Sequence, residues 1–304
     1  MTTLICLGLG YSARRYVADF GATYSHVFGT SRSAERPGEL AATRETPTIT
    51  RLMFDGTGAS SDLVSALRRA DRVLVSIPPS PQGDPVLAAL SEEFGGLPRL
   101  KTIVYLSSVG VYGDHAGAEV DETTPPAPKG QRALARHAAE RAWRALAGET
   151  GKPLAVLRLA GIYGPGRNVL VKLAQGRAVR IVKPDQVFNR IHVADVAQAI
   201  EAAFARRANG VFNVADDEPC AADDMIVYGA QLMGMEPPPA MSFSDAAASM
   251  SPMARSFYAE NKRVRNEKLK QELGVRLLYP NYRCGLSISE VNTVVTGATL
   301  GLAD

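Results

Sequence analysis

The chain has 304 residues, of which 46% are hydrophobic and 21% charged, and its formal net charge is +3. This is the composition of an ordinary globular protein, long enough for one large domain or one domain with a smaller lobe. Basic residues are scattered among acidic ones and no nucleic-acid-binding module is recognisable, so we expect no nucleic-acid partner.

The first two thirds of the chain alternate short apolar runs with helical patterns, which is typical of β-α-β units around a parallel sheet. The expected strands lack polar alternation, as strands covered on both faces do, and span residues 4–9, 26–30, 72–77, 102–107, 155–159 and 211–214. The expected helices of this part span residues 13–20, 61–69, 85–94, 131–147 and 194–206.

The pattern changes after Val214. An acidic turn at residues 216–219 precedes an expected helix at 222–233, which the prolines at 237–239 cannot continue. A second helix is expected at 261–273. We interpret this end of the chain as a small mixed lobe.

The cysteines and the first apolar run of the chain indicate the cellular compartment of the protein. Cys6, Cys220 and Cys284 lie far apart without metal-ligand spacing, which favours reduced thiols and predicts no metal site. The apolar run 4–9 is too short for a signal peptide or a membrane span. We therefore expect a cytoplasmic protein with no membrane partner.

A glycine-rich turn joins the first expected strand to the first expected helix. Gly8, Gly10, Tyr11, Ser12 and Ala13 belong to a G-x-G-x-x-A sequence. In this motif the glycines allow a tight turn and close approach of a pyrophosphate, and the small third residue allows close helix–strand packing. The helix start supplies unpaired N–H groups to the anion. The motif predicts a dinucleotide site; the alternative is a turn that needs glycine only for its geometry.

The end of the second expected strand indicates which dinucleotide binds. NAD-binding proteins usually carry an acid there for the ribose 2′-hydroxyl, but no acid occurs between Gly21 and Ala34. Ser31 and Arg32 suit a 2′-phosphate instead, with Arg36 as a helper, unless Arg32 is simply a solvated loop charge. We therefore favour NADP, with NAD possible.

Four segments together resemble one enzyme family. They are residues 105–113 (YLSSVGVYG), 120–126 (VDETTPP), 157–166 (LRLAGIYGPG) and 189–196 (NRIHVADV). The pattern is similar to the extended, atypical short-chain dehydrogenase/reductase family, the branch with NAD-dependent nucleotide-sugar epimerases and dehydratases, and it spans nearly the whole chain.

The resemblance implies an α/β fold with a Rossmann-type, doubly wound parallel sheet and a small C-terminal substrate lobe. The dinucleotide-binding domain would comprise residues 1–166 and 189–215, and the lobe residues 167–188 and 216–304. The activity implied is hydride chemistry on a hydroxyl or carbonyl group of a small molecule such as a sugar nucleotide. Relatives commonly form homodimers through the helices expected here at 85–94 and 131–147.

The resemblance also assigns roles to single residues. Ser108 matches the family's active-site serine, whose hydroxyl would orient a substrate oxygen. Asp55 resembles the aspartate that contacts adenine, although a turn aspartate before Gly56 is the alternative, and Pro78 lies where relatives pass backbone along the cofactor. Tyr112 and Tyr163 belong to segments that approach the substrate.

The catalytic helix departs from the family. Arg132 and Arg136 stand where relatives have the tyrosine and lysine of Y-x-x-x-K. Arginine stays protonated, so Arg132 cannot shuttle a proton, but it can bind an anionic substrate group, or it is an exposed helix charge. Arg136 can keep the lysine's contact with the nicotinamide ribose.

Two interpretations follow from this departure. In the first, another group has taken over proton transfer, and Tyr112, Tyr163, His115 and His137 are the candidates. In the second, the chain is a non-catalytic NADP-binding redox sensor or interaction protein that has lost the proton shuttle.

Overall fold

A seven-stranded parallel sheet forms the centre of the molecule in the computed structural model, which describes residues 2–32 and 49–286. Its strands are β1 Thr3–Leu7, β2 His26–Ser31, β3 Ile49–Met53, β4 Arg72–Val75, β5 Thr102–Ser108, β7 Leu154–Leu159 and β11 Gly210–Val214. Their order across the sheet is β11-β7-β5-β4-β1-β2-β3. The predicted α/β fold with a Rossmann-type parallel sheet is confirmed.

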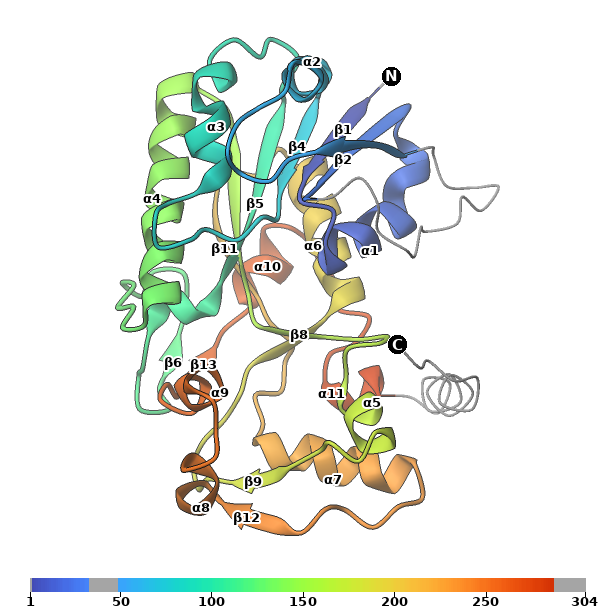
Figure 1. Cartoon of the computed structure of the whole chain (residues 1–304), viewed down its shortest axis with the longest axis vertical. Helices are drawn as coiled ribbons and strands as arrows, with labels where there is room; N and C mark the ends of the chain where they lie inside the picture. The colour runs from blue at the N-terminus through green and yellow to red at the C-terminus, as the bar shows by residue number, and fades with distance from the viewer. Residues whose placement is uncertain (1, 33–48, 287–304) are drawn as a thin grey trace.

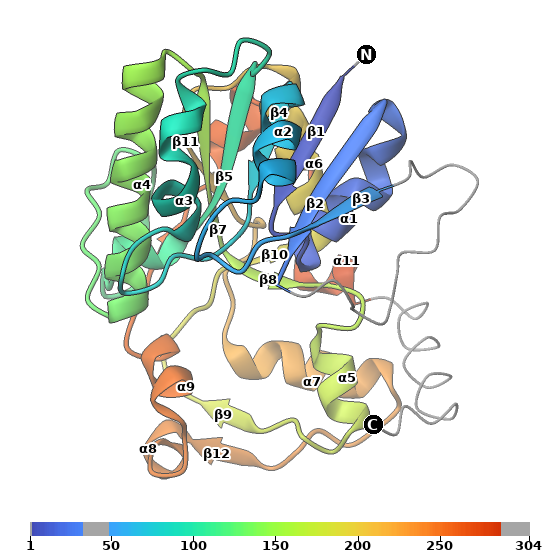
Figure 2. The same cartoon turned by 45° about the horizontal axis from the view of Figure 1, so that its top comes forward.

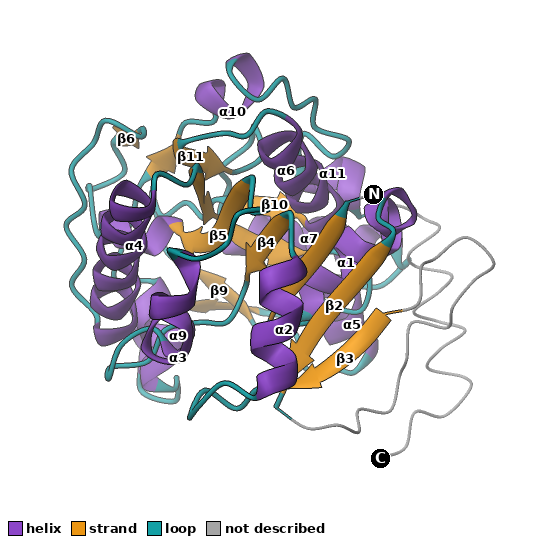
Figure 3. Ribbon diagram, turned by 90° about the horizontal axis from the view of Figure 1, so that it is seen from above, coloured by secondary structure: helices purple, strands orange, loops and turns teal. Residues whose placement is uncertain are grey.

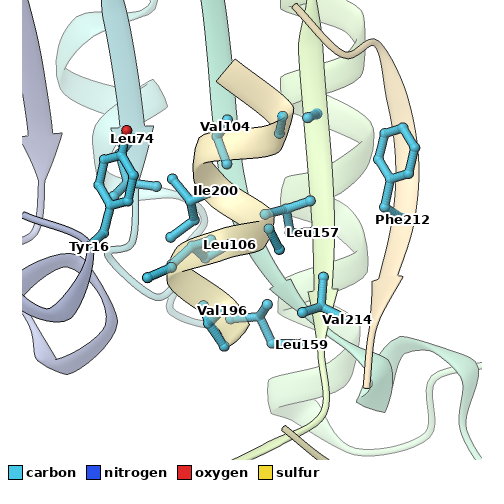
Figure 4. Packing of buried hydrophobic residues seen from close by; sticks show 14 of the residues in the cluster. Tyr16, Leu74, Val104, Leu106, Leu157, Leu159, Val196, Ile200, Phe212 and Val214 are labelled. Carbon is cyan, nitrogen blue, oxygen red and sulfur yellow. The ribbon is translucent and has the colours of Figure 1, made fainter. Parts of the chain in front are cut away.

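Helices cover both faces of this sheet (Figure 3). They are α1 Tyr11–Phe20, α2 Ser61–Arg69, α3 Pro85–Phe94, α4 Gln131–Thr150 and α6 Val193–Ala205. Helices α1 and α6 bury side chains such as Tyr16 and Ile200 against one face, where Ile200 lies beside Leu106 and Leu157 (Figure 4). Helices α2, α3 and α4 form a second core on the other face. Burial on both faces explains why the strands lack polar alternation.

Smaller elements gather beyond the carboxyl ends of the central strands (Figures 1 and 2). They are η2 Val109–Tyr112, β6 Glu119–Val120, β8 Gly161–Tyr163, α5 Val169–Ala174, β9 Arg180–Val182, β10 Arg190–His192, α7 Ala222–Leu232, β12 Ala240–Ser242, α8 Phe243–Ala247, α9 Pro252–Phe257, β13 Arg263–Val264 and α11 Tyr282–Gly285. Two other short elements, η1 Gly21–Thr23 and α10 Glu267–Gln271, pack beside the sheet instead. Helices α5 and α7 share a third hydrophobic cluster with α11. No helix in the two described ranges combines the length and apolar character needed to cross a bilayer.

Two of the differences from the sequence prediction have a clear physical reason. Strand β3 was missed because it lies at the sheet edge and is only partly buried. The predicted helix at 261–273 is wrong in its first half. Residues Arg263–Val264 extend as β13 beside β6, and the Arg263 and Arg265 amides donate to the Ala118 and Val120 carbonyls at 2.9 Å, so α10 starts only at Glu267.

Candidate active site

The turn after β1 is held by residues of β2 and of the segment that follows β4. The Gly8 amide donates to Thr30 Oγ1 at 2.7 Å, and Ser76 Oγ donates to the Gly8 carbonyl at 2.5 Å. Gly8 has a φ of +99°, a backbone conformation that residues with a side chain rarely adopt. A Cβ at Gly8 would lie 2.8 Å from Ile77 Cγ1 and 2.9 Å from Ser76 Oγ. Gly8 is therefore required by both conformation and space.

Gly10 differs from Gly8 in having room around it. It caps the start of α1 with an extended backbone and no side-chain cap, and a Cβ there would meet no atom within 4 Å. The first amides of a helix have no acceptor within the helix, and an anion can satisfy them. Beyond the turn, Ala13 is fully buried and Ser12 nearly so, which keeps α1 close to the sheet. The open space at Gly10 and the helix start fit a pyrophosphate.

The turn lies at the point where the sheet's connections reverse direction. β1 has β2 on one side and β4 on the other, and ligands of open α/β sheets bind at the carboxyl ends of such a strand pair. Gly8, Ser31, Ser76 and Ser108 all end or follow neighbouring strands at this edge. The structure therefore gathers predicted cofactor and substrate residues that lie up to 100 positions apart in sequence.

The residues expected around the adenosine half lie on the outer part of this edge. Ser31 ends β2 and is half-buried, and Arg32 follows it with an exposed side chain. Arg36 falls outside the described residues. Tyr11 points away from the turn, because its hydroxyl donates to the Pro165 carbonyl at 3.0 Å.

Asp55 and Pro78 follow strands β3 and β4, and both are exposed. Asp55 Oδ1 accepts from the Thr57 amide at 2.9 Å and the Thr57 hydroxyl at 2.7 Å, and these bonds hold the pKa of Asp55 below its usual range. Gly56 has a φ of +96°. This geometry is that of an aspartate stabilising a turn, the alternative weighed from the sequence.

The two serines at the end of β5 have different surroundings. Ser107 is buried and donates to the carboxylate of Glu140, which also accepts from Arg158 at 2.7 Å in a buried ion pair. Ser108 is half-buried, and its Oγ accepts from the Gly110 amide at 3.1 Å at the start of η2. The hydroxyl hydrogen of Ser108 is therefore not used by that bond and can be donated to a substrate oxygen.

The two arginines of α4 lie one turn apart but differ in their contacts. Arg136 Nη1 donates to the Leu106 carbonyl at 2.9 Å and the Tyr105 hydroxyl at 3.2 Å, so its guanidinium lies over β5 near Ser108. Arg132 is exposed and makes no hydrogen bond or ion pair to any part of the chain that the structure describes. Arg132 is thus available to a ligand, whereas Arg136 is partly engaged.

The four candidates for proton transfer are held by other contacts or lie elsewhere. Tyr112 is fully buried and its hydroxyl donates to Asn213 Oδ1 at 2.8 Å, and burial raises its pKa. Tyr163 is 4% exposed and its hydroxyl donates to the Asn281 carbonyl at 3.2 Å. A ring nitrogen of His115 contacts the Tyr112 carbonyl at 3.1 Å, and His137 lines a pocket on another face of α4.

Two residues near this edge escaped the sequence prediction. Burial raises the pKa of the Tyr105 hydroxyl, the partner of Arg136, to about 12. Lys262 is buried and its Nζ donates to the Gly113 carbonyl at 2.6 Å, across 149 positions, while pairing with Glu260 at 2.7 Å. No spacing pattern in the sequence could reveal Lys262, because the contact joins the lobe to the loop after Ser108.

The parallel sheet, the glycine turn at its reversal point and the strand-ending serine define an extended Rossmann-type protein of the short-chain dehydrogenase/reductase kind. Residues 85–215 match the model of the NAD dependent epimerase/dehydratase family. This match confirms the resemblance found in the sequence.

Known proteins similar to the chain include one curated relative and several solved structures. Protein YeeZ of Escherichia coli (strain K12) is 28% identical over 229 residues, which are 73% of this chain and 76% of YeeZ. A functionally unknown conserved protein from Silicibacter pomeroyi DSS is 44% identical with a TM-score of 0.83, over 96% of this chain and 99% of its own. UDP-glucose 4-epimerase from Thermotoga maritima, solved with UDP-glucose, has a TM-score of 0.76 at 18% identity, over 97% and 99% of the chains, and this likeness shows the fold.

Proposed function

We propose that the chain is an NADP(H)-binding oxidoreductase of the epimerase/dehydratase type, acting on a hydroxyl or carbonyl group of a small molecule. The observation that carries this proposal is the turn at Gly8 and Gly10, which is locked by β2 and β4 on one side and open toward the start of α1 on the other. Gly10 has a φ of −87° and no protein atom near its Cβ position, so neither backbone geometry nor protein packing requires glycine there, whereas close approach of a pyrophosphate would. We also propose a cytoplasmic homodimer.

The preference for NADP rests on the end of β2. Arg32 is exposed beside Ser31, and the sequence has no acid between Gly21 and Ala34 that could hold a ribose 2′-hydroxyl. A 2′-phosphate would accept charge-assisted hydrogen bonds from both side chains. Calorimetry should show tighter binding of NADP(H) than of NAD(H), and Arg32→Asp should reverse the order. Equal affinities that Arg32→Asp leaves unchanged would exclude this assignment.

The proposed chemistry uses residues at the ends of β5 and on α4. The bound nicotinamide would supply or accept the hydride. Ser108 would donate its hydroxyl hydrogen to the substrate oxygen, since its Oγ already accepts from the Gly110 amide. Arg136, held over β5, would bind the ribose, and the exposed Arg132 would bind an anionic group of the substrate. Tyr112 and Tyr163 are left out of the substrate site, because both are buried with bonded hydroxyls.

The substrate would enter between the carboxyl edge of the sheet and the lobe formed by residues 167–188 and 216–286, the described part of the predicted lobe. A sugar nucleotide fits the unpaired cation of Arg132 because it carries phosphate charge. The 4-epimerase of similar fold was solved with such a molecule. A panel of sugar nucleotides and simple carbonyl compounds, assayed by nicotinamide absorbance, tests this substrate class.

A second function is favoured by one observation. In the described residues Ser108 hydrogen-bonds only a backbone amide, and no tyrosine or histidine side chain reaches it. This suits a non-catalytic NADP-binding sensor or interaction protein. Arg132→Tyr combined with Arg136→Lys restores the family's pair, and it should produce turnover if only the proton shuttle is missing. If the unmodified chain already turns over a compound of the panel, the non-catalytic function is excluded.

A further inference from the structure

A pocket of about 270 Å³ lies between α4, the acidic loop after β6 and the edge strand β11. These elements meet at one end of the sheet (Figure 3). Strands β7 and β5 separate β11 from β4, so the pocket is distinct from the proposed dinucleotide site at the ends of β1 and β4. The function proposed above makes no use of it.

The pocket has an excess of positive charge. Arg141, Arg144, Arg158 and Lys268 line it together with two acids, Glu122 and Glu140. Four cations against two acids leave two positive charges unbalanced. A pocket of this kind favours an anionic ligand.

The acids of the pocket are already engaged. Glu140 accepts from Arg158 at 2.7 Å and from Ser107. Glu122 Oε1 accepts from the Asn213 amide at 2.7 Å, and burial raises the pKa of Glu122. Within residues 2–32 and 49–286, Arg141, Arg144 and Lys268 consequently make no salt bridge.

The helix presents these groups on one face. His137, Arg141 and Arg144 follow the spacing i, i+4, i+7, which places them along the same side of α4. Arg136, which contacts β5, lies about 100° around the helix from His137, and Arg132 lies one turn before Arg136. The two faces of α4 therefore carry two separate groups of cations.

Two nitrogens at the pocket wall lack partners in the described structure. His137 Nδ1 is buried without a hydrogen bond. Arg158 is 3% exposed, and its Nη1 also lacks a hydrogen bond. The guanidinium of Arg158 lies 4.7 Å from the centre of the Tyr112 ring. Buried polar groups are normally hydrogen-bonded, so these two nitrogens leave the wall of the pocket incompletely satisfied beside its cations.

We propose that this pocket binds a small phosphate monoester through Arg141, Arg144 and Lys268. A phosphate monoester carries about two negative charges at neutral pH, which balances the excess in the pocket. Guanidinium groups match phosphate oxygens in pairs, and the ammonium of Lys268 adds a point charge. Glu140 lines the pocket, and its carboxylate also accepts from Ser107 and pairs with Arg158. The Glu140–Arg158 ion pair would therefore lie between the ligand and β5, the strand that ends at Ser108.

Calorimetry with glycerol 3-phosphate and with inorganic phosphate tests the proposal on the full chain. We expect binding of glycerol 3-phosphate, weakened about tenfold by Arg144→Gln and by Lys268→Gln, as loss of one charged hydrogen bond implies. Lys172→Gln removes an exposed cation from α5, and Arg32→Gln removes the cation beside β2; both should bind as the unmodified chain does. Thermal unfolding verifies that each variant is folded.

Three results would overturn the proposal. The first is no binding of either phosphate at millimolar concentration. The second is unchanged affinity in folded Arg144→Gln and Lys268→Gln variants. The third is equal weakening in Arg32→Gln, which would place the anion at the proposed dinucleotide site, or in Lys172→Gln, which would indicate attraction by net charge alone. None of these results depends on whether a dinucleotide binds.

Discussion

Replacing Gly8 by alanine should destabilise the fold, whereas the same change at Gly10 should leave stability intact and weaken dinucleotide binding. At Gly8 the φ of +99° is strained for alanine, which costs about 1–3 kcal/mol. Contacts of 2.8 Å to Ile77 Cγ1 and 2.9 Å to Ser76 Oγ add about 1–3 kcal/mol of overpacking. We expect a total loss of about 2–6 kcal/mol, a large share of the roughly 5–15 kcal/mol typical of folded proteins.

At Gly10 the expectation is reversed. Its φ of −87° is accessible to alanine, and the new Cβ meets no protein atom within 4 Å. The free energy of unfolding should change by less than about 0.5 kcal/mol. The methyl group would occupy the space where the pyrophosphate approaches α1, so we expect NADP(H) to bind about tenfold more weakly, a change of about 1.4 kcal/mol.

Urea unfolding and calorimetry together measure both effects. Trp143 is the chain's one tryptophan and is fully buried, so its fluorescence reports unfolding directly. A Gly8→Ala variant as stable as the unmodified chain would refute the steric reasoning. A Gly10→Ala variant that binds NADP(H) normally would refute the placement of the pyrophosphate at this turn.

Three other predictions concern stability and assembly. Glu140→Ala leaves the buried Arg158 guanidinium without its carboxylate, and urea unfolding should show a loss of about 3–5 kcal/mol; a loss below 1 kcal/mol would contradict this. Burial raises the pKa of Asp216 to about 8, so the folded state keeps a proton that the unfolded chain releases above about pH 4. Stability should therefore fall as pH rises from about 4 to 8, by at most about 1.4 kcal/mol per pH unit from this group, and Asp216→Asn should flatten the slope of the unfolding free energy against pH. Light scattering at micromolar concentration should give twice the 32.4 kDa chain mass if α3 and α4 form a dimer interface, and Leu134→Glu, at an exposed apolar position of α4, should shift the mass toward the monomer.

Local patterns in the sequence determined most of the sheet and its helices. Predicted helices at 61–69 and 85–94 coincide with α2 and α3, where Ser60 and Asp84 accept from the first amides. The turn from Gly8 to Ala13 could also be located, because its signal lies within one strand–turn–helix unit. These features depend on residues a few positions apart, for which periodicity and turn chemistry are sufficient.

The tertiary structure decided which side chains are available. Tyr112 and Tyr163 belong to segments near the site, yet their rings turn into the interior, where Asn213 and Asn281 accept their hydroxyl hydrogens across 101 and 118 positions. Lys262 reaches Gly113 only because β13 pairs with β6, a pairing that replaced a predicted helix. Such contacts join segments that the sequence pattern treats separately, so the sequence determined where the dinucleotide turn is, and the fold alone decided which charges around it remain unpaired.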